Sequence, residues 1–280
     1  MRLRPLLAAV SIPALLLVGY SQRVRIADAW RTRTAPTLPP PVAYEDVKPV
    51  PLPAPVPAPV PVTPKPETPA PAQEEPKPVE PAPAPAALPE SINLAVPFTP
   101  QAPRANWDAF HEEACEEASL LMVHRFYEGD QANRLDPDFV EEQLAKMAAF
   151  EDGLFGYNTD TTVAQVGTLA EQMLGYEHVE ALDNPSVDDL KKHLAAGHPV
   201  IIPAAGREIG NPYFTAPGPE YHMLVLRGYT ADAKFITNDP GTRRGEAFLY
   251  PVESVMAAMK DWNQQDQLAN GPRRALVIFP

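Results

Sequence analysis

Hydrophobic residues follow three different patterns along the chain. Residues 6–20 form an almost unbroken apolar run that follows Arg2 and Arg4. Between residues 36 and 89, proline alternates with alanine, valine, lysine and glutamate. After Glu90 the apolar residues recur first at helical and then at strand spacing. These patterns divide the chain into a short apolar segment, a proline-rich segment and a globular part of about 190 residues.

Helical spacing dominates the first half of the globular part, after a short apolar strand at 92–97. A helix begins near Cys115, and Ala118, Leu121, Met122 and Phe126 lie on its buried face. Three more helices are predicted. One begins at Asp136-Pro137, one covers about 161–175, and one covers 186–196 with Ser186 as its N-cap and Gly197 at its end.

Strand-like apolar runs dominate the second half, at 199–203, 221–228, 234–237, 247–250 and 274–279. Only residues 251–262 interrupt them as a helix. A helix-rich half followed by a strand-rich half predicts an α+β fold, with the helical first half packed on a mostly antiparallel sheet.

The N-terminal patterns predict a membrane-tethered protein. Residues 1–22 have the length and charge of a signal peptide or signal-anchor helix. Residues 23–90 are expected to be a disordered proline-rich linker, on the order of 150 Å long if fully extended, which also suits a cell-wall-crossing arm. We therefore expect domain boundaries at 1–22, 23–90 and 91–280. The domain would lie outside the cytoplasm, and it would be secreted if the segment is cleaved.

Charge and cysteine content exclude several functions. The formal net charge of −13 argues against a nucleic-acid partner, because phosphate binding needs a surplus of Lys and Arg on one face. The single cysteine, Cys115, excludes an intramolecular disulfide and any site with several cysteine ligands. We expect no cofactor and no metal.

Cys115 stands at a predicted helix start, where the helix dipole and a histidine can lower a thiol pKa. Of the six histidines, His222 is distinctive because it begins an apolar strand, where a polar ring needs a partner or a cleft. The next strand ends in Asn238 and Asp239, either of which could orient the ring. Each feature alone also has an ordinary structural interpretation: a buried cysteine, a satisfied core histidine, and an Asx-Pro-Gly turn.

Four blocks of sequence, in this order, resemble the motifs of the C39-like peptidase family, which has a papain-like fold. They are VPFTPQ at 96–101, ACEEASLLM at 114–122, YHMLVLRGY at 221–229 and NDPG at 238–241.

The resemblance implies Cys115 as nucleophile, His222 as general base and acid, and Asp239 as the group that orients His222. It implies that Gln101 and the Cys115 amide form the oxyanion hole. The substrate would then be a peptide or protein, cleaved through a thioester.

Alternatives remain at this stage. His111, Glu112 and Cys115 fall within one helical turn and could bind a metal. A papain-like fold also supports amidase or transacylase chemistry on cell-wall peptides, and a catalytically silent binding module retains the same fold. We expect an active Cys115 to react with iodoacetamide at pH 6 faster than a free thiol does.

Overall fold

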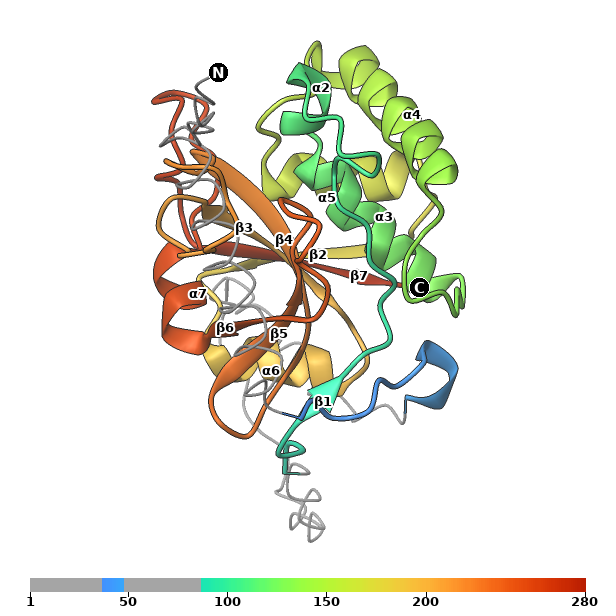
Figure 1. Cartoon of the computed structure of the whole chain (residues 1–280), viewed down its shortest axis with the longest axis vertical. Coiled ribbons are helices and arrows are strands. Elements are labelled where there is room, and N and C mark those ends of the chain that lie inside the picture. The colour runs from blue at the N-terminus through green and yellow to red at the C-terminus, as the bar shows by residue number, and fades with distance from the viewer. Residues whose placement is uncertain (1–36, 48–86) are drawn as a thin grey trace, which may run out of the picture. The chain divides into compact units, whose positions relative to one another are not determined.

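The structure is a computed structural model that describes residues 37–47 and 87–280 (Figure 1). The predicted signal or anchor segment, 1–22, and most of the predicted linker lie outside the described residues. Within the described ranges, no helix is long and apolar enough to cross a membrane. The helices and strands described belong to the unit that runs from Pro39 to Pro280.

The predicted helices form where their end signals place them. Helix α3 (Cys115–Tyr127) is followed by α4 (Pro137–Phe155), whose N-cap Asp136 accepts two backbone N–H bonds. Helix α5 (Val163–Gln172) and helix α6 (Val187–Ala195) each begin at a capping box, in which the side chains at Ncap and N3 bond each other's backbone N–H groups. Two shorter helices are α2 (Ala109–Glu112) and α7 (Val252–Ala258), so the helix predicted at 251–262 ends four residues early.

The strands form one antiparallel sheet. They are β1 (Ile92–Asn93), β2 (His178–Asp183), β3 (Val200–Ala205), β4 (Tyr221–Tyr229), β5 (Lys234–Asn238), β6 (Phe248–Pro251) and β7 (Arg274–Phe279). The order is β2-β7-β3-β4-β5-β6, and β1 pairs with β4. Every pairing between these strands is antiparallel, which confirms the predicted α+β class.

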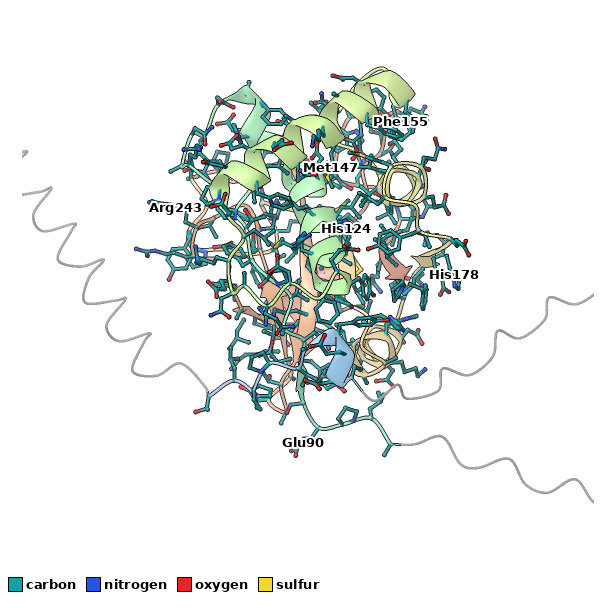
Figure 2. All side chains as sticks on the ribbon, turned by 90° about the vertical axis from the view of Figure 1, so that its right-hand side faces the viewer. Glu90, His124, Met147, Phe155, His178 and Arg243 are labelled. Carbon is teal, nitrogen blue, oxygen red and sulfur yellow. The ribbon has the colours of Figure 1, made fainter. Side chains whose placement is uncertain are left out.

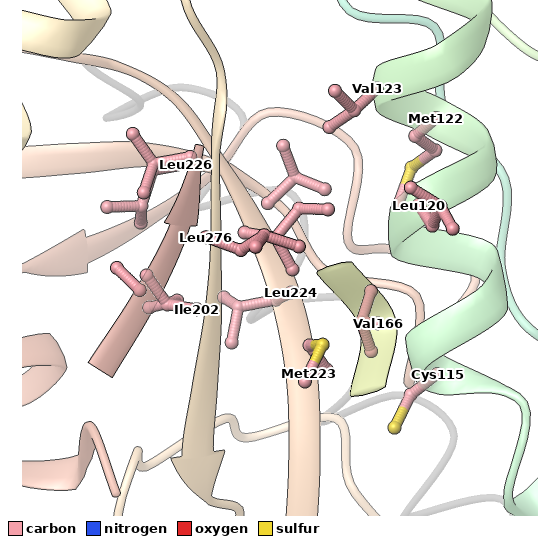
Figure 3. Close-up of a cluster of buried hydrophobic side chains, with 14 of the residues drawn as sticks. Cys115, Leu120, Met122, Val123, Val166, Ile202, Met223, Leu224, Leu226 and Leu276 are labelled. Atoms are coloured by element: carbon pink, nitrogen blue, oxygen red, sulfur yellow. The ribbon is translucent and has the colours of Figure 1, made fainter. Parts of the chain in front are cut away.

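Helix α3 packs against β4, the strand that carries His222. Leu120 and Val123 of α3 belong to the same buried cluster as Leu224 and Leu226 of β4 and Val166 of α5 (Figure 3). All nine residues of β4 are buried. The dense packing of side chains around α3 and α4 is visible in Figure 2. This packing fixes the start of α3 against the start of β4.

Two strands differ from those that the sequence predicts. Strand β2 was not predicted, because its residues are mostly exposed and polar residues interrupt its apolar alternation. It forms because Val179 and Leu182 pair with Ile278 and Ala275 of β7. Of the strand predicted at 92–97, only Ile92 and Asn93 pair with β4 as a strand, and Leu94 forms an isolated parallel bridge with Val42.

A further difference concerns residues 39–47, which the prediction assigns to the linker. The backbone of Val42 bonds to Asn93 and Ala95, and the Asn93 side chain donates to the Pro39 carbonyl. The Tyr44 ring packs edge-on against Phe126 and Tyr127 at the end of α3. Residues 39–47 therefore belong to the folded unit and lie beside β1 (Figure 1).

Candidate active site

Cys115 is the first residue of α3, and its side chain is buried at the base of that helix (Figure 3). Although burial raises the pKa of the Cys115 thiol by more, contact with the Met223 backbone lowers it. Since Met223 follows His222 in β4, this contact places the thiol beside the strand that carries the histidine. The structure thus brings the predicted helix start and the predicted strand together.

The thiol itself donates to a carboxyl group. Cys115 Sγ lies 2.9 Å from Glu116 Oε2, and no hydrogen bond joins it to His222 within the part of the chain described. Burial raises the pKa of the Cys115 thiol well above its usual value, and the negative charge of Glu116 raises it further. The expectation of a thiol pKa lowered by the helix start and a histidine is therefore wrong for this state, because desolvation and a neighbouring acid outweigh the helix dipole.

His222 is buried and bound to Asp239. Its Nε2 lies 2.8 Å from Asp239 Oδ1, which also accepts from the Gly241 N–H at 2.9 Å. Its Nδ1 makes no hydrogen bond to any described residue, which leaves that nitrogen as the candidate proton acceptor. The edge of the imidazole meets the Phe214 ring at a centroid distance of 5.2 Å.

The other carboxylate oxygen of Asp239 is held by two residues that the sequence did not single out. Asp239 Oδ2 accepts from Tyr250 Oη at 2.5 Å and from Asn211 Nδ2 at 2.8 Å. Burial would raise the pKa of Asp239, but the charge of His222 and the donors around the carboxylate outweigh it and lower the pKa. Asp239 is therefore an ionised partner for His222. No local sequence pattern links Asn211 or Tyr250 to it.

Asn238 points elsewhere. Its Nδ2 donates to the carbonyls of Val96 and Pro97, and its Oδ1 accepts from Arg227. Of the two candidates left open by the sequence, the structure sets Asp239 against His222 and Asn238 against the segment after β1.

Gln101 is buried, and its amide is engaged by backbone carbonyls. Nε2 donates to His111 O at 2.8 Å and to Glu112 O at 2.9 Å. Oε1 is buried without a hydrogen-bond partner among the described residues. Both amide hydrogens are thus bonded to carbonyls of α2, and an oxyanion would need one of them.

One cleft of about 1040 Å³ is lined by Cys115, His222 and Gln101. Carboxylates gather on part of its wall, where burial and the charge of Asp160 raise the pKa of Glu113. Elsewhere the wall carries arginines, and Arg243 projects at the edge of the molecule in Figure 2. The cleft has room for an extended peptide segment.

The alternative metal site finds no support in the positions of its residues. His111 Nδ1 lies 2.8 Å from Asp108 Oδ1, and its Nε2 lies 2.9 Å from Glu141 Oε2. No group of three candidate ligands converges anywhere in the described ranges. His111 is accordingly a structural residue that joins the start of α2 to α4.

Glu116 is a contact of Cys115 that sequence reasoning missed. It is almost completely buried and also lines the cleft. A signal was present, because Glu116 precedes Leu120 and Val123 by four and seven residues, which places all three on one face of a helix. An acid on an apolar helical face indicates a specific partner.

Comparisons with known proteins show which family and which solved structures the chain resembles. A family model described as "Peptidase_C39 like family" matches residues 93–270. The chain is 20% identical to a crystal structure described as a C39-like peptidase from Bacillus anthracis, with a TM-score of 0.44, over 68% of this chain and 98% of that one. It is 14% identical to xylellain, a cysteine protease from Xylella fastidiosa, with a TM-score of 0.42, over 69% and 87% of the two chains. No curated protein matches the chain.

Proposed function

The chain belongs to the C39-like peptidase family, whose model covers residues 93–270, and on that premise we propose that Cys115, His222 and Asp239 form its catalytic triad. The domain is a cysteine-type peptidase with the predicted papain-like fold. The observation that carries the proposal is the His222–Asp239 pair, in which His222 lines the same cleft as the only thiol of the chain.

The proposed reaction begins when the thiol proton passes to Nδ1 of His222. The thiolate attacks the carbonyl carbon of a peptide bond, a C–S bond forms, and the π electrons move to oxygen. As the carbonyl re-forms, the C–N bond breaks and the amine leaves with the proton from His222. Water, deprotonated by His222, then hydrolyses the thioester.

The oxyanion of this reaction would meet the Cys115 backbone N–H at the start of α3 and one amide hydrogen of Gln101. Because both hydrogens of Gln101 are bonded to carbonyls in the free enzyme, we propose that the substrate displaces one of these bonds. A single donor of this kind is worth about 3 kcal/mol of the barrier, so Gln101→Ala should weaken turnover without abolishing it.

A product scan tests the proposed function. Wild type and Cys115→Ala are incubated with a peptide library and with peptidoglycan fragments, and the products are compared by mass spectrometry. We expect cleaved peptides only with wild type, and their loss in His222→Ala. Identical product profiles for wild type and Cys115→Ala would contradict the proposal, and cleavage of cell-wall fragments alone would reassign the substrate class.

We also propose that residues 1–22 tether the domain outside the cytoplasm; the support is the apolar run at 6–20 behind two arginines. Because residues 39–47 pack on the domain, the spacer after the tether is residues 23–38, which span at most about 55 Å at 3.3–3.6 Å per residue. A reporter fused after Glu90 should be active only after export, and a reporter active only in the cytoplasm would overturn this proposal.

A further inference from the structure

The inference concerns Glu116, and it rests on the proposed role of Cys115 as nucleophile. We propose that Glu116 sets the protonation state of that nucleophile: its protonated carboxyl donates a hydrogen bond to the Cys115 thiolate, and its ionised carboxylate holds the proton on the sulfur. Glu116 is then a direct partner of the reacting atom, in addition to the proposed triad.

The two carboxyl oxygens of Glu116 have different partners. Oε1 accepts the backbone N–H of Thr161 at 3.0 Å, and Oε2 lies 2.9 Å from Cys115 Sγ. In a neutral carboxyl group one oxygen carries the proton and the other acts as acceptor. Because Oε1 accepts the Thr161 N–H, Oε1 is the acceptor oxygen. The proton of neutral Glu116 therefore resides on Oε2 and points at the sulfur.

The surroundings of Glu116 favour its neutral form. Burial raises its pKa to about 8, although the hydrogen bond from Cys115 opposes the shift. Several titratable groups face Glu116. They are Cys115 and Glu117 on the same helix, α3, together with Glu151 on α4, Asp160 before α5 and Tyr221 on β4. The carboxyl groups among them add repulsion against an ionised Glu116.

A thiolate and a carboxylate at 2.9 Å are two like charges in a buried site, so they do not both ionise near neutral pH. When Glu116 is neutral, its O–H supports the thiolate while the thiol proton passes to His222. When Glu116 is ionised, it takes the thiol proton as a hydrogen bond and repels negative charge on sulfur. The pair therefore titrates as one coupled unit.

Alkylation by iodoacetamide measures the ionisation of the Cys115–Glu116 pair directly, because Cys115 is the only cysteine in the chain. For wild type we expect the rate to rise with pH, level off near pH 8 as Glu116 ionises, and rise again when the pair loses its second proton. The intact full-length chain is used. A wild-type profile with one simple ionisation would overturn the proposal, whether or not any variant folds.

The decisive variant is Glu116→Gln, which is neutral at every pH and keeps an oxygen for Thr161 and an N–H for the sulfur. We expect a single ionisation, with an alkylation rate close to that of wild type at pH 6, where Glu116 is neutral, and about tenfold faster than wild type at pH 9, where the ionised Glu116 of wild type raises the pKa of the thiol by about one unit. The matched control is Glu151→Gln, a buried acid on α4 that makes no hydrogen bond to Cys115; its profile should keep the plateau, which moves to slightly lower pH because Glu151 no longer repels an ionised Glu116. A slower or unchanged rate in Glu116→Gln at pH 9 would show that an ionised Glu116 does not hold the proton on the sulfur, and would overturn the proposal.

This experiment needs no peptide substrate, so it separates the present inference from the proposed function. If no peptide is cleaved, the coupled titration of Cys115 and Glu116 is still measured. Where a cleaved peptide is known, kcat should decline above about pH 8 in wild type and should lose that decline in Glu116→Gln. A wild-type kcat that rises steadily through pH 9 would contradict the proposal.

Discussion

At the scale of single residues, Asp239 is held by more partners than a triad requires. Four donors converge on its two oxygens, from His222, Gly241, Tyr250 and Asn211. The backbone is fixed as well, since a Cβ on Gly245 would lie 1.8 Å from the Asp239 carbonyl oxygen. The carboxylate therefore has one position, and the imidazole that it orients has one too.

Tyr250→Phe tests the contribution of one donor. Removal of the hydroxyl withdraws a hydrogen bond that favours the ionised carboxylate, so the pKa of Asp239 rises. The acid limb of kcat/KM should move to higher pH, because protonated Asp239 no longer stabilises the imidazolium. We expect about a tenfold loss at pH 5 and a smaller loss at pH 7.5, since a hydrogen bond to a charged group is worth about 1.5–3 kcal/mol.

The control for this prediction is Tyr157→Phe. The Tyr157 hydroxyl bonds only to Gln165 and Gln264, so its loss should leave the acid limb in place. The prediction fails if Tyr250→Phe lowers kcat/KM equally at pH 5 and pH 7.5, because a uniform loss indicates altered packing rather than a shifted titration.

The sequence singled out some of these residues and missed others, for a physical reason. Cys115, His222 and Asp239 stand at the start of a helix and at the ends of apolar strands, where a reactive side chain is conspicuous against its neighbours. Asn211 and Tyr250 reach Asp239 only through the path of the loop before β4 and the register of β5 and β6. Such contacts arise from tertiary structure and leave no local pattern.

At the scale of elements, two local signals predicted α3 to α6 and most of the sheet: apolar periodicity, which all of these helices carry, and an Asp or Ser cap, which α4 and α6 carry. Strand β2 carried neither and depends on its partner β7. Residues 39–47 could not be assigned to the fold from the sequence, since their proline-rich composition continues into residues 48–86.

Tyr44→Ala tests whether residues 39–47 stabilise the domain. The half-buried ring contacts Phe126 and Tyr127 at centroid distances of 5.7 and 5.1 Å. Aromatic pairs contribute about 0.5–1.5 kcal/mol beyond the area they bury. We expect Tm to fall by about 3–8 °C, at 2–4 °C for each kcal/mol in a domain of this size.

The matched substitution is Asp46→Ala, at the other end of the one-turn 3₁₀ helix η1 (Tyr44–Asp46), where the side chain is exposed. Its Tm should stay close to that of wild type by differential scanning fluorimetry. Equal Tm values for Tyr44→Ala and Asp46→Ala would show that residues 39–47 add nothing to the stability of the domain.

At the scale of the whole molecule, buried acids link stability to pH. Burial raises the pKa of Glu116 to about 8 and that of Glu151 to about 7. In the unfolded chain these groups ionise near their ordinary value of 4.5. Between these limits the native state binds more protons than the unfolded state, so the free energy of unfolding falls as pH rises.

We therefore expect the protein to be most stable near pH 5 and to lose stability up to about pH 8, by on the order of 1 kcal/mol per pH unit for each such acid. Together the two acids lower the free energy of unfolding by about 5 kcal/mol between pH 5 and pH 8, so Tm should drop by about 10–20 °C at 2–4 °C for each kcal/mol. The formal net charge of −13 acts in the same direction through self-repulsion, so the slope alone does not identify the acids. Glu151→Gln separates the two causes. It removes a buried acid, but it removes only one of the 36 acidic residues, so the net charge hardly changes. Its Tm should depend less steeply on pH than that of wild type, and parallel Tm profiles would assign the slope to surface charge instead.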